Sequence, residues 1–250
     1  MNDGRLYLIP SPLGDNDPRE VLPAPVLSLL TNISTYVVEE TRTARRYLSA
    51  AGLRGRIGEL EFHELNEHTR PEEVDALLEL FSPRSGESRG NDVGLITEAG
   101  LPAVADPGAQ LVARCHIHGI EVVPLVGPSS LMLALMASGL NGQRFAFCGY
   151  LPAKTEERRK AIREAERRSA QLDQTQLFIE TPYRNDALMA DLLATLQPST
   201  RLCIAADLTL PTQTVRTRTV RQWNQCRTAS RTLRDGGPVG KRPCVFLLLA

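Results

Sequence analysis

Residues 95–108 read Leu-Ile-Thr-Glu-Ala-Gly-Leu-Pro-Ala-Val-Ala-Asp-Pro-Gly. The apolar start of this segment predicts a buried strand over Val93–Thr97, and the turn residues that follow predict a loop that leads into a helix after Asp106. Glycine and small side chains in such a loop let backbone amides and carbonyls approach a ligand closely. The segment therefore predicts a strand, a ligand-binding loop and a helix, which is the repeating unit of an α/β fold.

Strand and helix patterns alternate through the first half of the chain. Short apolar runs predict further strands at Arg5–Pro10, Thr35–Glu39 and Glu121–Leu125. Helix-like segments separate the strands, at Val21–Leu30, Thr43–Ala51, Pro71–Phe81 and Gln110–His118. This alternation predicts a doubly wound, mostly parallel sheet with helices on both faces, and in such sheets ligands bind at the carboxyl ends of the strands.

The pattern changes near Val126. An apolar helix is expected at Leu131–Ala137, and strands are expected at Arg144–Cys148, Gln176–Glu180, Arg201–Ala206, Thr214–Thr219 and Cys244–Leu249. With fewer helices between the strands, we expect residues 1–125 to form an N-terminal α/β domain and residues 126–250 a C-terminal mixed α+β domain. Residues 154–171 are densely charged, so we expect an exposed helix or a mobile arm there rather than core.

The composition is that of an ordinary globular protein, with 42% apolar and 23% charged residues. The N-terminus lacks the pattern of a secretion signal, and no stretch approaches the roughly 20 apolar residues of a membrane helix. We therefore expect a cytoplasmic protein without a membrane partner. Five scattered cysteines form no Cys-x-x-Cys pair and have no histidine at ligand spacing, so we expect buried free thiols and no metal site.

Charge is unevenly distributed, although the formal net charge is zero. The last fifty residues contain two acidic and nine basic residues, the latter being Arg201, Arg216, Arg218, Arg221, Arg227, Arg231, Arg234, Lys241 and Arg242. A basic segment suits phosphate binding, because neutralising phosphates releases counterions. A solvated arginine-rich surface explains the same pattern.

Six further segments agree in order and spacing with one protein family. They are residues 6–14 (Leu-Tyr-Leu-Ile-Pro-Ser-Pro-Leu-Gly), 39–45 (Glu-Glu-Thr-Arg-Thr-Ala-Arg), 62–67 (Phe-His-Glu-Leu-Asn-Glu), 122–130 (Val-Val-Pro-Leu-Val-Gly-Pro-Ser-Ser), 149–152 (Gly-Tyr-Leu-Pro) and 180–184 (Glu-Thr-Pro-Tyr-Arg). Together with residues 95–108 they resemble the family of the 16S ribosomal RNA cytidine ribose 2'-O-methyltransferase, a branch of the tetrapyrrole methylase superfamily. The resemblance extends almost from end to end, to about Trp223.

The resemblance implies a two-domain methyltransferase with S-adenosylmethionine in the cleft between its domains. By position, the family's cofactor contacts fall on Pro10, Ala99, Gly100, Leu101, Val104, Ser129, Ser130, Glu180 and Leu208. The Gly-x-Gly-x-x-Gly turn of dinucleotide enzymes is absent, which disfavours a nicotinamide or flavin cofactor. Enzymes of this fold are usually homodimers, and the helix at Leu131–Ala137 either contributes to such an interface or belongs to the core.

Three motifs depart from the family's usual sequence. The family typically has Glu-Asp-Thr-Arg, Ser-Asp-Ala-Gly-Thr-Pro and Glu-Ser-Pro-His-Arg at residues 39–42, 97–102 and 180–184. At Glu40 and Glu98 the exchange lengthens a carboxylate by one methylene. Since a displacement of about 1 Å at a reacting centre can lower a rate about 10²-fold, the methyl donor is a firmer expectation than the acceptor.

Methyl transfer to a hydroxyl also requires removal of a proton. The candidates for this step are Glu40, Glu98, Asp106 and His63, although Glu40 also suits an ion pair with Arg42 and Asp106 suits a helix cap. For contacts with substrate phosphates we expect Arg42, Arg45 and Arg184, whose guanidinium forks match phosphate oxygens.

Three functions remain open from the sequence. The first is methylation of a ribose hydroxyl in the RNA of the small ribosomal subunit, which would make that RNA or subunit the partner. The second is methylation of a tetrapyrrole or another small molecule, because a fold does not fix its substrate. The third is a paralogue that binds the cofactor without catalysing a reaction.

Overall fold

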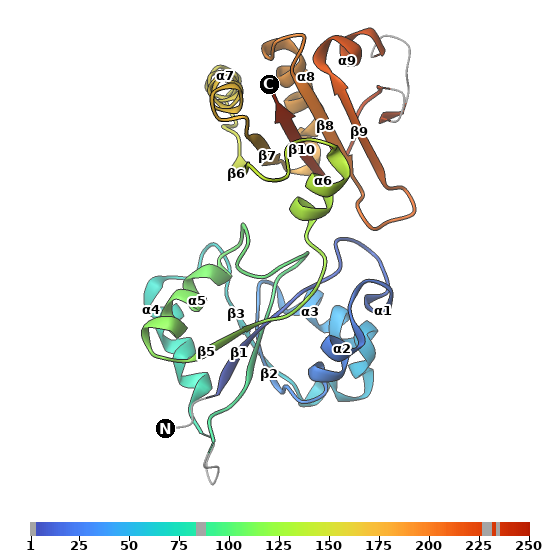
Figure 1. Cartoon of the computed structure of the whole chain (residues 1–250). Helices are drawn as coiled ribbons and strands as arrows, with labels where there is room; N and C mark the ends of the chain where they lie inside the picture. Colours follow the sequence, from blue (N-terminus) through green and yellow to red (C-terminus); the bar gives the residue numbers. More distant parts are fainter. Residues whose placement is uncertain (1–3, 84–88, 227–231, 234–235) are drawn as a thin grey trace. The chain divides into compact units, whose positions relative to one another are not determined.

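The computed structural model describes residues 4–83, 89–226, 232–233 and 236–250 (Figure 1). The chain divides into two compact units, Met1–Ser129 and Ser130–Ala250. The predicted boundary, after Leu125, lies just before this division. Part of the predicted basic C-terminal segment lies outside the described residues. This part includes Arg227, Arg231, Arg234 and the acidic residue Asp235.

The first unit contains a five-stranded parallel sheet. Its strands are β1 (Arg5–Ile9), β2 (Thr35–Val38), β3 (Glu61–Glu64), β4 (Val93–Ile96) and β5 (Glu121–Pro124), in the order β3-β2-β4-β1-β5. Strand β3 is absent from the sequence prediction. It is an edge strand whose side chains stay partly or fully exposed, so it has no apolar run.

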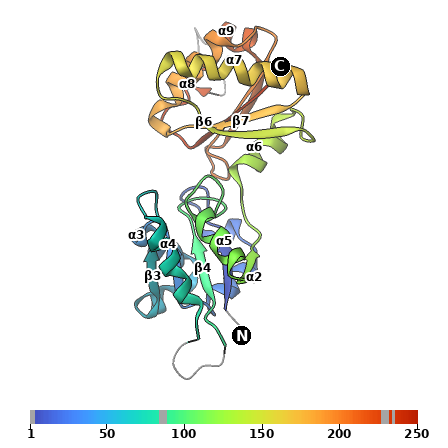
Figure 2. The same ribbon diagram turned by 90° about the vertical axis from the view of Figure 1, so that its left-hand side faces the viewer.

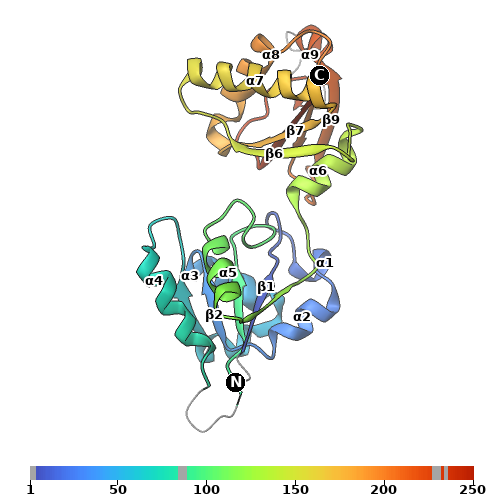
Figure 3. The same ribbon diagram turned by 60° about the vertical axis from the view of Figure 1, so that its left-hand side comes forward.

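Helices cover both faces of this sheet, as a buried parallel sheet requires. The helices are α1 (Pro18–Val21), α2 (Ala24–Leu30), α3 (Thr41–Leu48), α4 (Pro71–Ala76) and α5 (Gly108–Ile117), with short turns η1 (Ser49–Leu53), η2 (Arg54–Glu59) and η3 (Leu77–Phe81). Figure 1 shows α1, α2 and α3 on one face and α4 and α5 on the other, and in Figure 3 α5 and α2 lie on either side of β1. Two separate apolar clusters result, one containing Ile9 and Leu48 and the other containing Leu6 and Leu111.

The second unit contains a mixed five-stranded sheet. Its strands are β6 (Phe145–Tyr150), β7 (Thr175–Ile179), β8 (Arg201–Ala206), β9 (Thr214–Thr219) and β10 (Cys244–Leu249), in the order β6-β7-β10-β8-β9. Only β6 and β7 pair in parallel; the other pairs are antiparallel. The helices are α6 (Ser130–Ser138), α7 (Thr155–Leu172), α8 (Asn185–Thr195) and α9 (Val220–Cys226), with a turn η4 (Pro182–Arg184). Figure 2 shows α6 and α7 on opposite faces of this sheet.

The expectation of an exposed helix or a mobile arm at residues 154–171 was right for the helix and wrong for one of its sides. These residues form most of α7, and one side of the helix is buried, including Arg158 and the fully buried Ile162. Arg158 Nε donates to Asp191 Oδ2 of α8 over 2.7 Å, and both side chains are only 7% exposed. A charged residue thus occupies a core position because its partner is buried with it.

Three further observations concern the cysteines, membrane helices and metal ligands. Cys148 is exposed and Cys226 is only partly buried, so the expectation of buried thiols fails at these two residues. Among the described residues, no helix is both long and apolar enough to cross a membrane. Nor do the described histidine, cysteine and acidic side chains form a group of three or more that could hold a metal ion.

Candidate functional site

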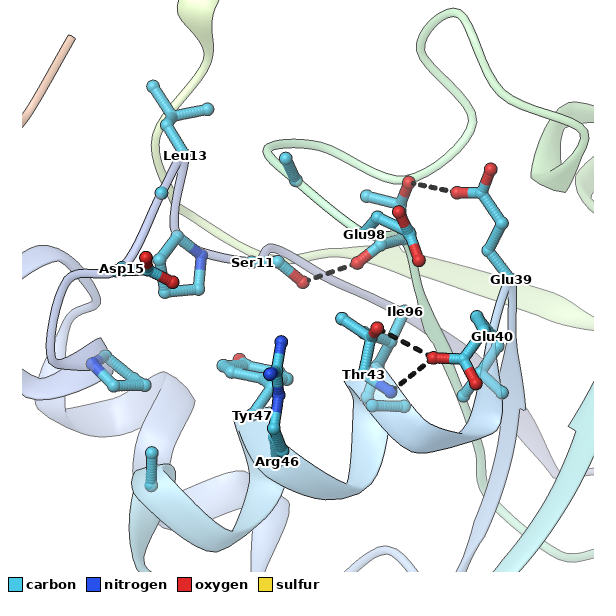
Figure 4. Close-up of a pocket in the computed structure, with 18 of the residues that line it drawn as sticks. Ser11, Leu13, Asp15, Glu39, Glu40, Thr43, Arg46, Tyr47, Ile96 and Glu98 are labelled. Atoms are coloured by element: carbon cyan, nitrogen blue, oxygen red, sulfur yellow. Dashed lines mark hydrogen bonds between the residues drawn. The ribbon is translucent and has the colours of Figure 1, made fainter. Parts of the chain in front are cut away.

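A pocket of about 410 Å³ lies at the carboxyl ends of β1, β2 and β4 (Figure 4). Three segments surround it: the loop after β1, the junction of β2 with α3, and the loop after β4. The lining residues are Ser11–Asn16, Pro18, Val38, Glu39, Glu40, Thr43, Ala44, Arg46, Tyr47, Ala50 and Ile96–Ala99. The position is the one at which open α/β sheets bind ligands, and the volume suits a small molecule or a single nucleotide.

Backbone hydrogen bonds join the loop after β1 to the loop after β4. Ser11 N donates to Gly100 O over 2.8 Å, Gly100 N donates to Ser11 O over 3.1 Å, and Ser11 Oγ donates to Thr97 O over 2.8 Å. Gly100 has a φ of 79°, and a Cβ there would lie 3.2 Å from the Leu13 side chain. These bonds bring four of the predicted cofactor contacts into one place, namely Pro10, Ala99, Gly100 and Leu101.

The loop that contains Val104 has a strained backbone. Ala103 and Ala105 have φ values of 64° and 63°, in the left-handed region that alanine seldom occupies, and Val104 between them is 45% exposed. Asp106 Oδ1 accepts hydrogen bonds from Ala103 N over 2.9 Å and from Gly108 N over 2.8 Å. Asp106 therefore holds this loop and the start of α5 in place, a structural use of a residue that sequence reasoning also offered as a base.

Glu40 has a similar structural role at the start of α3. Its carboxylate accepts hydrogen bonds from Arg42 N over 2.9 Å, from Thr43 N over 2.6 Å and from Thr43 Oγ1 over 2.7 Å. These bonds cap the helix, and they lower the pKa of Glu40 below its ordinary value because they stabilise the ionised form. A carboxylate with a lowered pKa is a weak proton acceptor at neutral pH.

Sequence reasoning missed Glu39, which lies at the end of β2. Its carboxylate is partly buried and accepts a hydrogen bond from Thr97 Oγ1 over 3.3 Å. Desolvation raises the pKa of Glu39 above its ordinary value, and the negative charges of Glu98 and Asp106 act in the same direction. The available signal was its place directly after a buried strand, as the first residue of the family-like segment 39–45.

Two other predicted residues differ in their surroundings. Glu98 is exposed and lines the pocket together with Glu39 and Glu40. His63 lies on β3, where its Nε2 atom is 3.0 Å from Glu61 Oε1, and it does not line the pocket. Of the four predicted candidates for proton removal, the pocket therefore includes Glu40 and Glu98.

The second unit holds the remaining predicted residues. Glu180 is buried, and its Oε1 atom accepts from Arg184 Nη2 over 2.6 Å and from Thr181 N over 2.7 Å. The Oε2 atom of Glu180 has no partner among the described residues. Glu180 raises the pKa of Arg184 through this hydrogen bond, so the guanidinium is held in an ion pair.

Leu208 and the two predicted serines take different positions. Leu208 is buried in a strained turn between Asp207 and Thr209, whose φ values are 53° and 74°. Ser130 is the first residue of α6, and Ser129 is the last residue of the first unit.

Comparison with known proteins gives a consistent result. The sequence profile of the tetrapyrrole (corrin/porphyrin) methylases matches residues 33–223. The ribosomal RNA small subunit methyltransferase I of Escherichia coli O157:H7 is 33% identical over 216 residues, which cover 86% of this chain and 68% of that protein. The protein of the same name from Neisseria meningitidis serogroup B is 33% identical over 217 residues, which cover 87% and 68%.

Solved structures share the fold at lower identity. The methyltransferase CobJ superposes with a TM-score of 0.58 at 18% identity, covering 98% of this chain and 94% of its own. The uroporphyrin-III C-methyltransferase of Thermus thermophilus complexed with S-adenosylhomocysteine gives a TM-score of 0.52 at 19% identity, covering 98% and 97%.

Proposed function

The chain belongs to the tetrapyrrole methylase family and is an S-adenosylmethionine-dependent methyltransferase, and we propose that it methylates a ribose 2'-hydroxyl of small-subunit ribosomal RNA. The observation that carries the proposal is the 33% identity, over most of this chain, to two proteins named as methyltransferases of that RNA. The structures of tetrapyrrole-modifying enzymes match at 18–19% identity, which supports the shared fold and not a shared acceptor.

The residues proposed to hold the cofactor are Pro10, Ala99, Gly100, Leu101, Val104 and Ser129 of the first unit and Ser130, Glu180 and Leu208 of the second. Two features of the chain fit this role. Gly100 pairs with Ser11 at a φ of 79° and has no side chain to occupy the space beside Leu13, and strained residues flank both Val104 and Leu208. Strained backbone persists where the surrounding structure enforces it, which is common at ligand sites. When bound, S-adenosylmethionine supplies an electrophilic methyl group on a sulfonium.

The chain itself must remove the proton of the attacking hydroxyl. We propose Glu39 as the acceptor, because its raised pKa brings it closer to the pH at which a general base is effective. Burial is the main cause of the raised pKa of Glu39; the charge of Glu98 adds to it, whereas the Glu98 backbone amide opposes it by hydrogen bonding. Glu98 is the alternative acceptor. Glu40 and Asp106 bind backbone amides and are proposed to shape the site.

The three arginines predicted to contact substrate differ in their surroundings. Arg42 and Arg45 are exposed on α3 and are proposed to contact RNA phosphates, whereas Arg184 is oriented by Glu180. A small ribosomal subunit is a cytoplasmic particle, so the proposed substrate places the enzyme in the cytoplasm.

An exposed apolar surface supports the predicted homodimer. Strand β6 is an edge strand, and its side chains Phe145, Phe147 and Tyr150 are 39%, 36% and 55% exposed. On α6, Met132 and Met136 are 43% and 78% exposed. Exposed apolar side chains on an edge strand mark an interaction surface, and we propose that a second copy of the chain covers it.

The test of the function uses the full chain, S-adenosylmethionine with a tritiated methyl group, and four acceptors: intact small subunits, protein-free 16S RNA, uroporphyrinogen III and buffer alone. A 2'-O-methyl group prevents alkaline cleavage of the adjacent phosphodiester. Label transferred to a ribose should therefore appear in alkali-resistant dinucleotides.

Label in those dinucleotides supports the proposal, and the comparison of the first two acceptors shows whether assembled subunits are required. Label in base-derived products or in the tetrapyrrole would overturn it. A Gly100→Val variant, which places a side chain against Leu13, serves as the cofactor-site control.

A further inference from the structure

Helix α3 has a cationic outer face. Arg42, Arg45, Arg46 and Ser49 follow the spacing i, i+3, i+4 and i+7, which aligns them on one side of a helix. The three arginines are exposed, while Tyr47 and its buried neighbours Ala44 and Leu48 form the inner face of α3. From Arg42 to Ser49 this face extends about 10 Å, at about 1.5 Å per residue.

The outer face borders an open groove of about 830 Å³. The lining residues are Glu40, Thr41, Arg42, Arg45, Arg46, Ser49, Ala50, Arg54 and Ile57. Arg54 and Ile57 come from η2, the turn after α3. The groove adjoins the 410 Å³ pocket, because Glu40, Arg46 and Ala50 line both hollows.

Ion pairing separates these arginines from the others in the same unit. Residues 1–129 contain no lysine, and the structure describes ten of their arginines. Six of the ten form ion pairs, namely Arg5–Glu121, Arg19–Asp17, Arg56–Glu59, Arg70–Glu73, Arg89–Asp92 and Arg114–Asp75. The four that form no ion pair with a described carboxylate are Arg42, Arg45, Arg46 and Arg54, and all four line the groove.

The groove lining carries four arginines and a single carboxylate, so its charge stays positive. Glu40 is the only acidic residue of the lining, and its oxygens bind the backbone amides of Arg42 and Thr43. Like charges three and four residues apart destabilise a helix. Arg45 is also oriented, with its guanidinium carbon 5.5 Å from the centre of the Phe62 ring. A row of cations that repel one another, with Arg45 oriented by Phe62, indicates an anionic ligand with several charges along its length.

We propose that this groove binds the sugar-phosphate backbone of single-stranded RNA beside the nucleotide to be methylated, and that the nucleotide reaches the pocket at Arg46. The inference rests on the proposed function and adds to it the path of the substrate and the roles of Arg46 and Arg54. Guanidinium groups suit phosphate oxygens, and the hydroxyls of Thr41 and Ser49 add donors on the same surface. Four separated cations match consecutive phosphates better than one compact anion.

The test measures binding of a fluorescein-labelled 12-nucleotide oligouridylate to the full chain by fluorescence anisotropy, between 50 and 200 mM KCl. For single-stranded nucleic acid the logarithm of affinity falls by about 0.7 per neutralised phosphate for each unit of log salt. Four contacts should weaken wild-type binding about 50-fold over this range. The Arg42→Gln/Arg45→Gln/Arg46→Gln variant keeps one contact and should weaken only about 3-fold.

The matched control removes three charges elsewhere, as Arg163→Gln/Arg167→Gln/Arg168→Gln on the exposed side of α7. It should retain the wild-type salt dependence. Calorimetric titration with S-adenosylmethionine checks that each variant keeps a folded cofactor site. The proposal that the groove binds RNA is refuted if the two triple variants lose salt dependence equally, or if neither variant loses it. Methyl transfer to ribosomal RNA without a groove effect would leave the proposed function standing, whereas groove binding without transfer to RNA would refute the function alone.

Discussion

Thr97 Oγ1 donates a hydrogen bond to Glu39 Oε2 over 3.3 Å, and this contact joins the carboxyl ends of β2 and β4. Both residues directly follow their strands, so the parallel sheet brings together two side chains that are 58 positions apart in the sequence. The neighbouring Glu98 adds a second carboxylate to the same edge of the sheet. A partly buried carboxyl group beside another negative charge is thereby built into the floor of the pocket.

Replacing Gly100 by valine should separate cofactor binding from general stability. At a φ of 79° a branched side chain is strained by about 1–2 kcal/mol, and its Cβ would also meet Leu13 and the Pro128 carbonyl. Gly119→Val is the control, since Gly119 has a φ of 73° with no atom within 4 Å of a Cβ. We expect similar losses of thermal stability, with weaker S-adenosylmethionine binding by calorimetry only for Gly100→Val. Equal affinities would remove Gly100 from the cofactor site.

The buried pair of Arg158 and Asp191 should contribute strongly to the second unit. Removing one partner leaves an uncompensated buried charge, which typically destabilises a protein by about 3–5 kcal/mol. Asp191→Ala should therefore lower the free energy of unfolding in urea by about that amount. The Arg158→Met/Asp191→Leu double variant should recover most of the loss, because it replaces both buried charges with apolar groups, and Arg159, the second partner of Asp191, is 40% exposed and can be solvated. A double variant as unstable as Asp191→Ala would show that α7 and α8 depend on the charges themselves.

The same pair shows where sequence reasoning ends. Short continuous apolar runs located most strands of both sheets. A strand buried on both faces must be apolar throughout, as β4 and β10 are. The burial of one side of helix α7 was not predicted, because that side includes Arg158. A charged residue in the core is recognised only once its buried partner, here Asp191, is located. Edge strand β3 was missed for the reverse reason, since its exposed side chains leave no pattern.

The site was predictable in part for a related reason. Motif spacing selected Glu40, Glu98 and Asp106 as candidates and suggested a capping role for Asp106, but it gave no sign that Glu40 binds the backbone amides of α3. That distinction depends on the direction of each side chain, which is set by tertiary contacts. Glu39 has the same chemistry as Glu40, and the two differ in burial and nearby charge at Glu39 and in the capping hydrogen bonds at Glu40.

Glu40 should stabilise the fold in a pH-dependent way. Its pKa in the folded chain is lowered by hydrogen bonds to Thr43 and to the Arg42 amide. Its contribution is therefore present above the ordinary glutamate pKa and is lost as the pH falls through the lower, folded-state value. Melting curves of Glu40→Ala should show a clear loss relative to wild type at pH 7 and a smaller difference near the acid end of the folded range. Glu40→Gln, which keeps one acceptor, should lie between the two.

Glu39 should control the pH dependence of methyl transfer. If it accepts the proton, activity rises as Glu39 ionises, and the midpoint lies above the ordinary glutamate pKa because burial and the charges of Glu98 and Asp106 oppose ionisation. Glu98→Gln removes one negative charge and should move the midpoint to lower pH. Thr97→Val removes a hydrogen bond that favours the ionised form and should move it to higher pH. A residue that only supports the fold would not produce opposite shifts.

Glu39→Gln completes this test. General base catalysis typically contributes about 10²–10⁴-fold, so a loss of that order in kcat is expected, with S-adenosylmethionine affinity unchanged. The thermal stability of Glu39→Gln at pH 7 should rise while its activity falls. A carboxyl group with a raised folded-state pKa stabilises the fold only at low pH, and this contribution is lost as the pH rises through that value. At pH 7 the neutral glutamine should therefore melt at a higher temperature than wild type. A less active but more stable variant cannot owe its defect to unfolding, whereas full activity would transfer the proton-accepting role to Glu98.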